Sequence, residues 1–281
     1  MEEKENNDSQ ILNSLKHLDF FISEISKIEP FFNGKDLKQN QTLVLGLLER
    51  LKYGSLHLKS VLSSESINSL EFSAGLTARA LLLDQLIGLN LYRLTEIARV
   101  KGQLEAEMEQ NTEDFCEKHL ADGFHSTIVY VEQAQTFGFI TFEEKKSLYN
   151  ELVRKYGYYF EEYSGNGAKL NVRTEKPDDN KTLFKKLAND SVLAPVAKIY
   201  DSYQYYSKYD HFSLLYFHLT REPLTKRLEN LYACIEGFIA YEAALCLMLA
   251  VFSKKEIPEV EQPLLGSFKY YMEYADKILR N

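Results

Sequence analysis

The sequence predicts an all-α fold, a single large helical bundle of about seven to nine helices. Glycine and proline are scarce, at 13 and 6 in 281 residues, so the chain lacks the many tight turns of a β-sandwich or barrel. Apolar residues recur at spacings of three and four along most of the chain, and no segment alternates convincingly between apolar and polar residues. A hydrophobic fraction of 45% and a charged fraction of 26% are ordinary for a soluble globular protein.

The helices follow one another from the N-terminus. The acidic segment 1–8 is expected to be a flexible tail, and residues 9–281 to form one domain with a polar loop near 164–181. Thr141 with Glu144 three residues later is a capping box that opens a helix. The other predicted helices cover residues 9–29, 41–63, 67–100, 111–136, 191–219, 222–252 and 267–279.

Charge and cysteine content restrict the class of partner and the compartment. The net charge is -8, and no basic stripe of the kind that binds phosphates is visible, although RNA binding at one local site stays open. Three cysteines without CxxC spacing favour a reducing cytoplasm. The apolar run 238–252 is shorter than the ~20 residues of a spanning helix and contains Glu242, so we expect a buried helix and no membrane.

Two charged residues interrupt the apolar helix predicted over 73–94. Arg79 and Asp84 lie about 140° apart on a helix, so they should not pair with each other. A buried unpaired charge is costly, so each needs a partner on another helix or a route to solvent. Glu236, which lies among apolar neighbours in 222–252, is the counter-charge that we expect for a buried Arg79.

The stretch YDSYQYYSKYDHFS, residues 200–213, is either a polar site or a helix face packed with rings. Tyr203, Ser207 and His211 recur every four residues and share one helical ridge. A regular helix lacks the strained turn that exposes a serine nucleophile, so Ser207 is not expected to attack a substrate. His211 is expected either as a buried structural residue or as a member of a functional site, and the tyrosines as packing.

No metal and no cofactor are predicted. Cys116, His119, Asp122 and His125 recur every three residues and drift by about 60° per step around a helix, so a solvated face is expected rather than a metal site. The segment SGNGAK lacks the spacing and the preceding strand of a phosphate-binding loop.

An arginine in an early apolar helix and a late Y-x-x-x-S-x-x-x-H element resemble the pattern of a bacterial all-helical family that is distantly similar to HEPN (higher eukaryotes and prokaryotes nucleotide-binding) domains. Arg79 matches the arginine, and Tyr203, Ser207 and His211 match the late element. Asp84 stands one position further along than the acid of the family pattern, which leaves its role open.

The resemblance implies further expectations. Active HEPN proteins are metal-independent ribonucleases with an R-x(4-6)-H motif, and Arg50 and His57 have this spacing in RLKYGSLH, although Leu51 follows the arginine where the family often has a polar residue. HEPN relatives also often dimerise and often act in bacterial stress, antiphage or toxin–antitoxin systems.

Three functions remain open. The first is a cytoplasmic HEPN-like binding protein with an internal polar site formed by Arg79, Asp84, Tyr203, Ser207, His211 and Glu236. The second is a metal-independent ribonuclease, in which His211 or His57 is the general acid/base and Arg79 or Arg50 stabilises the developing phosphorane charge. The third is an oligomerisation module that buries its tyrosine-rich helices and the segment 269–279 against a homodimer mate or a partner protein.

Overall fold

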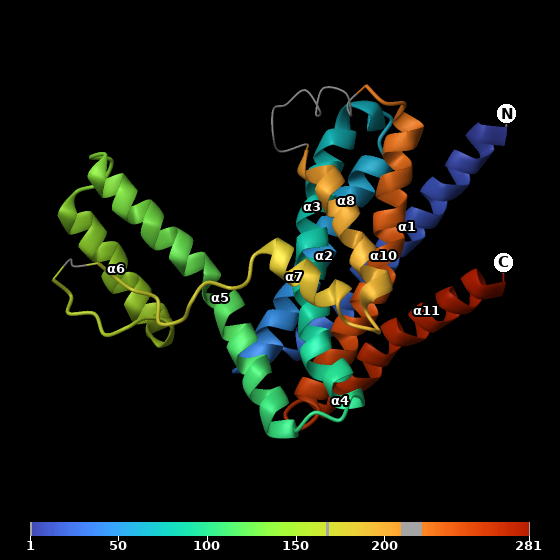
Figure 1. Ribbon diagram of the computed structural model, residues 1–281. Coiled ribbons are helices and arrows are strands. Elements are labelled where there is room, and N and C mark those ends of the chain that lie inside the picture. The colour runs from blue at the N-terminus through green and yellow to red at the C-terminus, as the bar shows by residue number, and fades with distance from the viewer. Residues whose placement is uncertain (1, 167–168, 209–220, 281) are drawn as a thin grey trace. The chain divides into compact units, whose positions relative to one another are not determined.

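The computed structural model describes residues 2–166, 169–208 and 221–280 (Figure 1). The prediction of an all-α fold is confirmed for these residues, whose one β-type contact is an isolated bridge between Phe160 and Val172. The chain divides into two compact units: unit 1 combines Met1–Glu109 with Asp179–Asn281, and unit 2 is Gln110–Asp178. Whether the two units fold as one domain stays a prediction.

The long helix α3 is the centre of unit 1. It packs against α2, α7, α8 and α10, and α10 also contacts α1, α2 and α11 (Figure 1). This position matches the apolar composition of both helices, since a helix that is hydrophobic nearly all round is stable only when other helices cover it. The helices of unit 1 are α1 (Glu2–Ile28), α2 (Gln39–Leu62), α3 (Ile67–Tyr92), α4 (Ala98–Val100), α7 (Asn180–Ala188), α8 (Ile199–Ser207), α10 (Leu224–Ser253) and α11 (Glu261–Arg280).

Most predicted helix boundaries agree with the structure within a few residues. The helix expected over 67–100 is α3 continued through a π-helical turn, Arg93–Ile97, into α4, which ends at Val100. The helix expected from residue 9 begins at Glu2, and the helix expected from residue 267 begins at Glu261. The helix expected over 191–219 is α8 in its described part, and residues 209–220 lie outside the described residues.

The polar loop predicted near 164–181 is confirmed in its described part as far as residue 179, but helix α7, which follows it, was not predicted. The helix begins where the loop ends, because the Asp179 side chain caps it and accepts a hydrogen bond from the Thr182 amide at 2.7 Å. Leu183 and Leu187, on its inner face, are almost fully buried. Asp and Asn are common both in loops and at helix starts, so composition alone did not separate the two cases.

Unit 2 contains the helical pair of α5 (Glu105–Thr136), whose first residues belong to unit 1, and α6 (Phe142–Tyr156). The predicted capping box is confirmed: the Glu144 amide donates to Thr141 Oγ1 at 3.2 Å, and the Thr141 amide donates to the Glu144 carboxylate at 2.7 Å. The fully buried Tyr149 is central to the core of this unit, and its hydroxyl donates to Glu132 at 2.6 Å.

Helices α3 and α10 approach closely at Gly88. A Cβ atom added there would lie 2.6 Å from Cε2 of Tyr241 and 3.2 Å from Cδ2 of Leu245, so any larger residue forces the two helices apart. In contrast, a Cβ atom added at Gly46 of α2 would meet nothing within 4 Å. The two glycines therefore form a matched pair.

Gly88→Ala should lower the free energy of unfolding by about 1–3 kcal/mol, because the added methyl group overpacks the contact between α3 and α10. Gly46→Ala should raise it by up to about 1 kcal/mol, since alanine is the better helix former. Urea titrations followed by circular dichroism measure both changes. Equal stability of the two variants would contradict the close approach at Gly88.

Candidate functional site

The candidate site is built around a carboxylate in the core of unit 1. Asp84 of α3 has a side chain that is 6% exposed, and its Oδ2 accepts a hydrogen bond from Nε of Arg50 on α2 at 2.7 Å. Arg50 itself is 59% exposed. The expectation that Asp84 needs a partner on another helix is therefore confirmed.

The electrostatics of this pair reflect its unequal burial. Burial raises the pKa of Asp84, although the hydrogen bond from Arg50 opposes this change. The same bond raises the pKa of Arg50, which stays a cation. Burial also raises the pKa of Tyr241 well above its ordinary value, and the nearby charge of Asp84 adds to that effect. Tyr241 is fully buried, and its hydroxyl has no hydrogen-bond partner among the described residues.

A groove of about 380 Å³ opens beside the pair. Arg50 and Tyr53 of α2 contribute exposed side chains to it, and α3 supplies most of the rest. Gly54 lets the two helices approach here, because a Cβ atom added to it would lie 2.7 Å from Leu81 Cδ1. The groove is shallow and open to solvent, so a ligand there would be only partly covered. The lining residues are Arg50, Tyr53, Gly54, Leu76, Thr77, Ala80, Leu81 and Asp84.

Arg79 and Tyr203 lie together elsewhere on α3 and α8. Cζ of Arg79 is 5.7 Å from the ring centroid of Tyr203, a cation–π distance. The Tyr203 hydroxyl accepts a hydrogen bond from the Asn180 side chain at 2.7 Å. Tyr203 and Tyr206 are buried, which confirms for these two rings the expectation that the tyrosines of this segment are packing.

The remaining predicted site residues are dispersed. Ser207 donates its hydroxyl to the Gln204 carbonyl of its own helix at 2.8 Å. Glu236 is exposed on α10, where its carboxylate accepts a hydrogen bond from the Tyr274 hydroxyl of α11. Its role as counter-charge to Arg79 stays a prediction. His211 lies outside the described residues.

Arg50 and His57 of the alternative pair are both exposed on α2. Seven residues place them on the same face of the helix, about 10.5 Å apart along its axis. In the sequence, the spacing between Arg50 and His57 was the only signal that pointed to Arg50. Its pairing with Asp84 and the proximity of Tyr241 had no sequence signal, because they depend on how α2, α3 and α10 pack.

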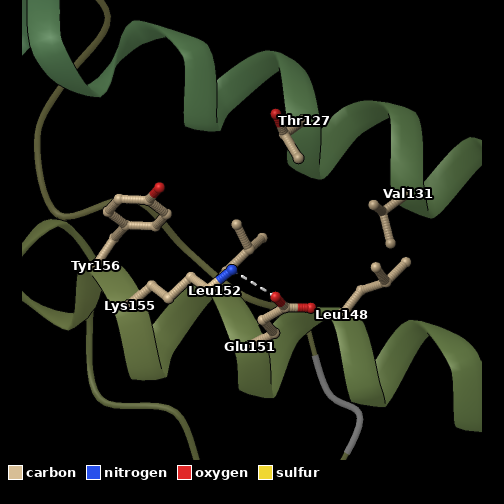
Figure 2. A pocket seen from close by; sticks show the side chains of 7 residues that line it. All are labelled: Thr127, Val131, Leu148, Glu151, Leu152, Lys155 and Tyr156. Carbon is tan, nitrogen blue, oxygen red and sulfur yellow. Dashed lines mark hydrogen bonds and ion pairs between the residues drawn. The ribbon is translucent and has the colours of Figure 1, made fainter.

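A second cavity, of about 140 Å³, lies between α5 and α6 in unit 2 (Figure 2). Figure 2 shows Thr127 and Val131 of α5 facing Leu148 and Leu152 of α6. The charged groups at its edge, Glu151 and Lys155, pair with each other at 2.6 Å. With its charges paired and its volume small, this cavity is a weaker candidate than the groove.

The described residues contain no group of three or more His, Cys, Asp or Glu side chains that could hold a metal ion. Two helical segments, Leu70–Val100 and Leu224–Ser253, are long and apolar enough to cross a membrane by length and composition, and 56% of the apolar window of each is buried inside the protein. That test is weak, because the core helix of a soluble protein also passes it. Comparison of the chain with family models, curated proteins and solved structures gave no match.

A second buried carboxylate, Glu242 of α10, lies outside the groove. It is fully buried, Oε1 accepts a hydrogen bond from Ser267 at 3.2 Å, and Oε2 has no partner among the described residues. Burial raises the pKa of Glu242 from 4.5 to about 8, and the nearby Glu24 adds to the rise. Between these two pKa values, Glu242 is therefore protonated in the folded protein and deprotonated in the unfolded chain.

The free energy of unfolding should fall as the pH rises towards 8, because a raised pKa in the folded state makes the unfolded state bind fewer protons. Burial lowers the pKa of His17 from 6.5 to about 4, which gives the opposite trend below pH 6.5. Between pH 6.5 and 8 the slope due to Glu242 should approach about 1.4 kcal/mol per pH unit.

Urea unfolding at four pH values across this window measures the slope. Glu242→Gln should abolish it, whereas Glu236→Gln, an exposed glutamate on the same helix, should leave it unchanged. A slope that survives in Glu242→Gln would assign the proton to another group.

Proposed function

We propose that this chain is a HEPN-like helical binding protein that holds an organic anion in the groove beside Arg50. The observation that carries the proposal is the bond from Nε of Arg50 to the buried Asp84. Asp84 is the one hydrogen-bond partner of Arg50 among the described residues, so both terminal Nη groups are left for a ligand.

A guanidinium held in this way suits anions. Its planar fork matches a carboxylate or phosphate in two parallel hydrogen bonds, and a carboxylate behind it fixes its orientation before the ligand arrives. The exposed ring of Tyr53 and the side chains of Leu76 and Leu81 line the same groove and suit an apolar or planar group. The ligand class is therefore an anionic group attached to a flat or apolar body, such as a nucleotide.

The HEPN-like assignment rests on the resemblance of the sequence. The contact between Arg79 and Tyr203 supports it, because two residues of the family pattern that are distant in sequence lie together. A role in a bacterial stress, antiphage or toxin–antitoxin system follows from the same resemblance and belongs to this proposal.

Metal-independent ribonuclease activity is the second candidate. The exposure of Arg50 and His57 on one face of α2 favours it, because one bound RNA strand could contact both side chains. Their positions lie about 10.5 Å apart along the axis, so the two side chains would have to lean towards each other to contact one phosphate.

Oligomerisation is the third candidate. Leu265, Phe268 and Met272 are 44%, 39% and 51% exposed on α11, and their spacing of three and four residues places them on one helical stripe. Exposed apolar stripes often mark protein contacts, so a homodimer mate or a partner protein stays a proposal.

The binding proposal predicts that AMP binds and that adenosine, which lacks the phosphate, binds much more weakly. Arg50→Ala should weaken AMP binding by about 10- to 100-fold, because a hydrogen bond to a charged group contributes about 1.5–3 kcal/mol. Arg50→Lys should retain only part of the AMP affinity, since lysine lacks the planar fork. Isothermal titration calorimetry measures each dissociation constant.

Lys59→Ala is the matched control, because it removes one half-exposed cation from the same helix, where Lys59 pairs with Asp19 outside the groove. It should bind AMP like the unmodified protein. Equal AMP affinities of Arg50→Ala and Lys59→Ala would contradict the proposed site.

The ribonuclease alternative predicts cleavage of mixed RNA in EDTA that is lost in His57→Ala or His211→Ala. Loss in one variant would identify the general acid/base, provided that circular dichroism shows the variant is folded. Intact RNA with the unmodified protein would contradict this alternative for these substrates, and cleavage that survives in both variants would exclude the two histidines.

A further inference from the structure

Helix α11 is attached to the rest of unit 1 by few buried groups. It packs against α1 and α10. In its described stretch 261–277, Leu264 and Ser267 are the only buried side chains, at 2% and 1% exposure. A helix held by so little buried surface opens locally at a smaller free-energy cost than the core helices α2 and α3.

Ser267 covers a buried carboxyl group. Its Oγ donates a hydrogen bond to Oε1 of Glu242 at 3.2 Å, and Glu242 is fully buried on α10. No cation bonds Glu242 among the described residues, and its Oε2 has no hydrogen-bond partner there. A buried carboxylate without a counter-charge is costly, so the docked state of α11 requires the neutral, protonated acid.

A second acid lies against the same turn of α11. Glu24 of α1 pairs with Lys27 at 2.5 Å, and its Oε2 would lie 2.9 Å from a Cβ atom added at Gly266, the residue before Ser267. The two acids therefore contact one turn of α11, Glu24 from α1 and Glu242 from α10. If Glu242 lost its proton, its negative charge would be repelled by that of Glu24.

The other titratable groups around Glu242 do not compensate its charge. Burial raises the pKa of the Cys246 thiol on α10 well above its ordinary value, and burial also raises the pKa of Tyr270 on α11. His17 of α1, whose Nδ1 lies 2.9 Å from the Tyr270 hydroxyl, is neutral at pH 7 because burial lowers its pKa to about 4. Helices α2 and α3 also pack against α10, and their described residues contribute no charge that acts on Glu242.

We propose that α11 is a proton-operated latch, which stays docked on α1 and α10 while Glu242 is protonated and is released when Glu242 gives its proton to the solvent. Opening of α11 lets water reach the ionised Glu242 and weakens its repulsion with Glu24. It also uncovers Leu264 and the ring of Phe20, which stacks on Tyr270 with centroids 3.7 Å apart. The latch therefore couples the ambient pH to the exposure of apolar surface in unit 1, independently of the groove.

Two groups determine the direction of the pH dependence. The pKa of Glu242 is about 8 in the docked state against 4.5 in water, so docking weakens as the pH rises from 4.5 to 8. The pKa of His17 is about 4 against 6.5 in water, so docking also weakens as the pH falls from 6.5 to 4. The two effects offset each other between pH 4.5 and 6.5, and α11 is released on the alkaline side.

Two cysteines of α10 report on the latch in the intact chain. Cys246 is fully buried and bonds Ser267 of α11, whereas Cys234 is buried and bonds Ser202 of α8. Iodoacetamide labelling at pH 6.5 and 8.5, with each rate divided by that of N-acetylcysteine at the same pH, measures the exposure of each thiol by mass spectrometry. The corrected rate of Cys246 should rise about 10- to 30-fold, and at pH 8.5 it should exceed that of Cys234 at least about tenfold.

Three variants test which group operates the latch. Glu242→Gln cannot ionise and keeps an acceptor for Ser267, so the corrected rate of Cys246 should be equal at the two pH values. Glu24→Gln should give a smaller rise than the unmodified protein, because it removes the neighbouring charge. Glu229→Gln is the matched control, since Glu229 is exposed near the start of the same helix, and it should behave like the unmodified protein. Circular dichroism verifies that each variant is folded.

Three results would overturn the proposal. Equal corrected rates for Cys246 and Cys234 at pH 8.5 would mean that α11 opens only when the whole unit unfolds. A corrected Cys246 rate that did not rise between the two pH values would mean that α11 stays docked at alkaline pH. A rise that survived in the folded Glu242→Gln variant would assign the pH dependence to another group.

Discussion

The ion pair between Asp84 and Arg50 is the constraint on which the arrangement of unit 1 depends. A carboxylate that is 6% exposed is tolerated in an apolar helix because a guanidinium from α2 bonds to it directly. Breaking such a pair by removing one partner typically costs about 3–5 kcal/mol, because the other charge is left uncompensated. The exposure of Arg50 lowers that cost here, since solvent screens its side of the pair. The pair therefore ties α2 to α3 at this point of their contact.

The same helix α3 separates two environments of opposite character. On the side of α2, Asp84 orients an exposed cation beside an open groove. The neighbouring residue, Gln85, is 1% exposed and donates from its side-chain amide to the Gly237 carbonyl of α10 at 3.3 Å. Successive residues of a helix point about 100° apart, so α3 can present a charged side chain to α2 and a buried amide to α10 at adjacent positions.

Helical periodicity was sufficient to predict the class and most of the helices, and it also placed Arg79 and Asp84 on different faces of α3. It could not identify Arg50 as the partner of Asp84, because the pattern on each helix does not say which face of another helix opposes it. Helix α7 was missed for a local reason: its cap at Asp179 has the composition of a loop. The unsatisfied groups of Gln85 and Tyr241 had no sequence signal, since both residues are common in ordinary helices.

The buried polar groups of α3 and α10 are costly for folding. Asp84, Gln85, Tyr241 and Glu242 are all buried, and the last three carry polar atoms without partners among the described residues. Leaving a buried polar atom unsatisfied costs about 1–3 kcal/mol, and apolar residues of similar volume would avoid that cost. Proteins tolerate violations of this kind mainly at functional sites. These groups do not form one cluster: Gln85 and Tyr241 lie where α3 meets α10, whereas Glu242 bonds Ser267 of α11 and lies near Glu24 of α1, so the unsatisfied atoms at the two places need separate explanations.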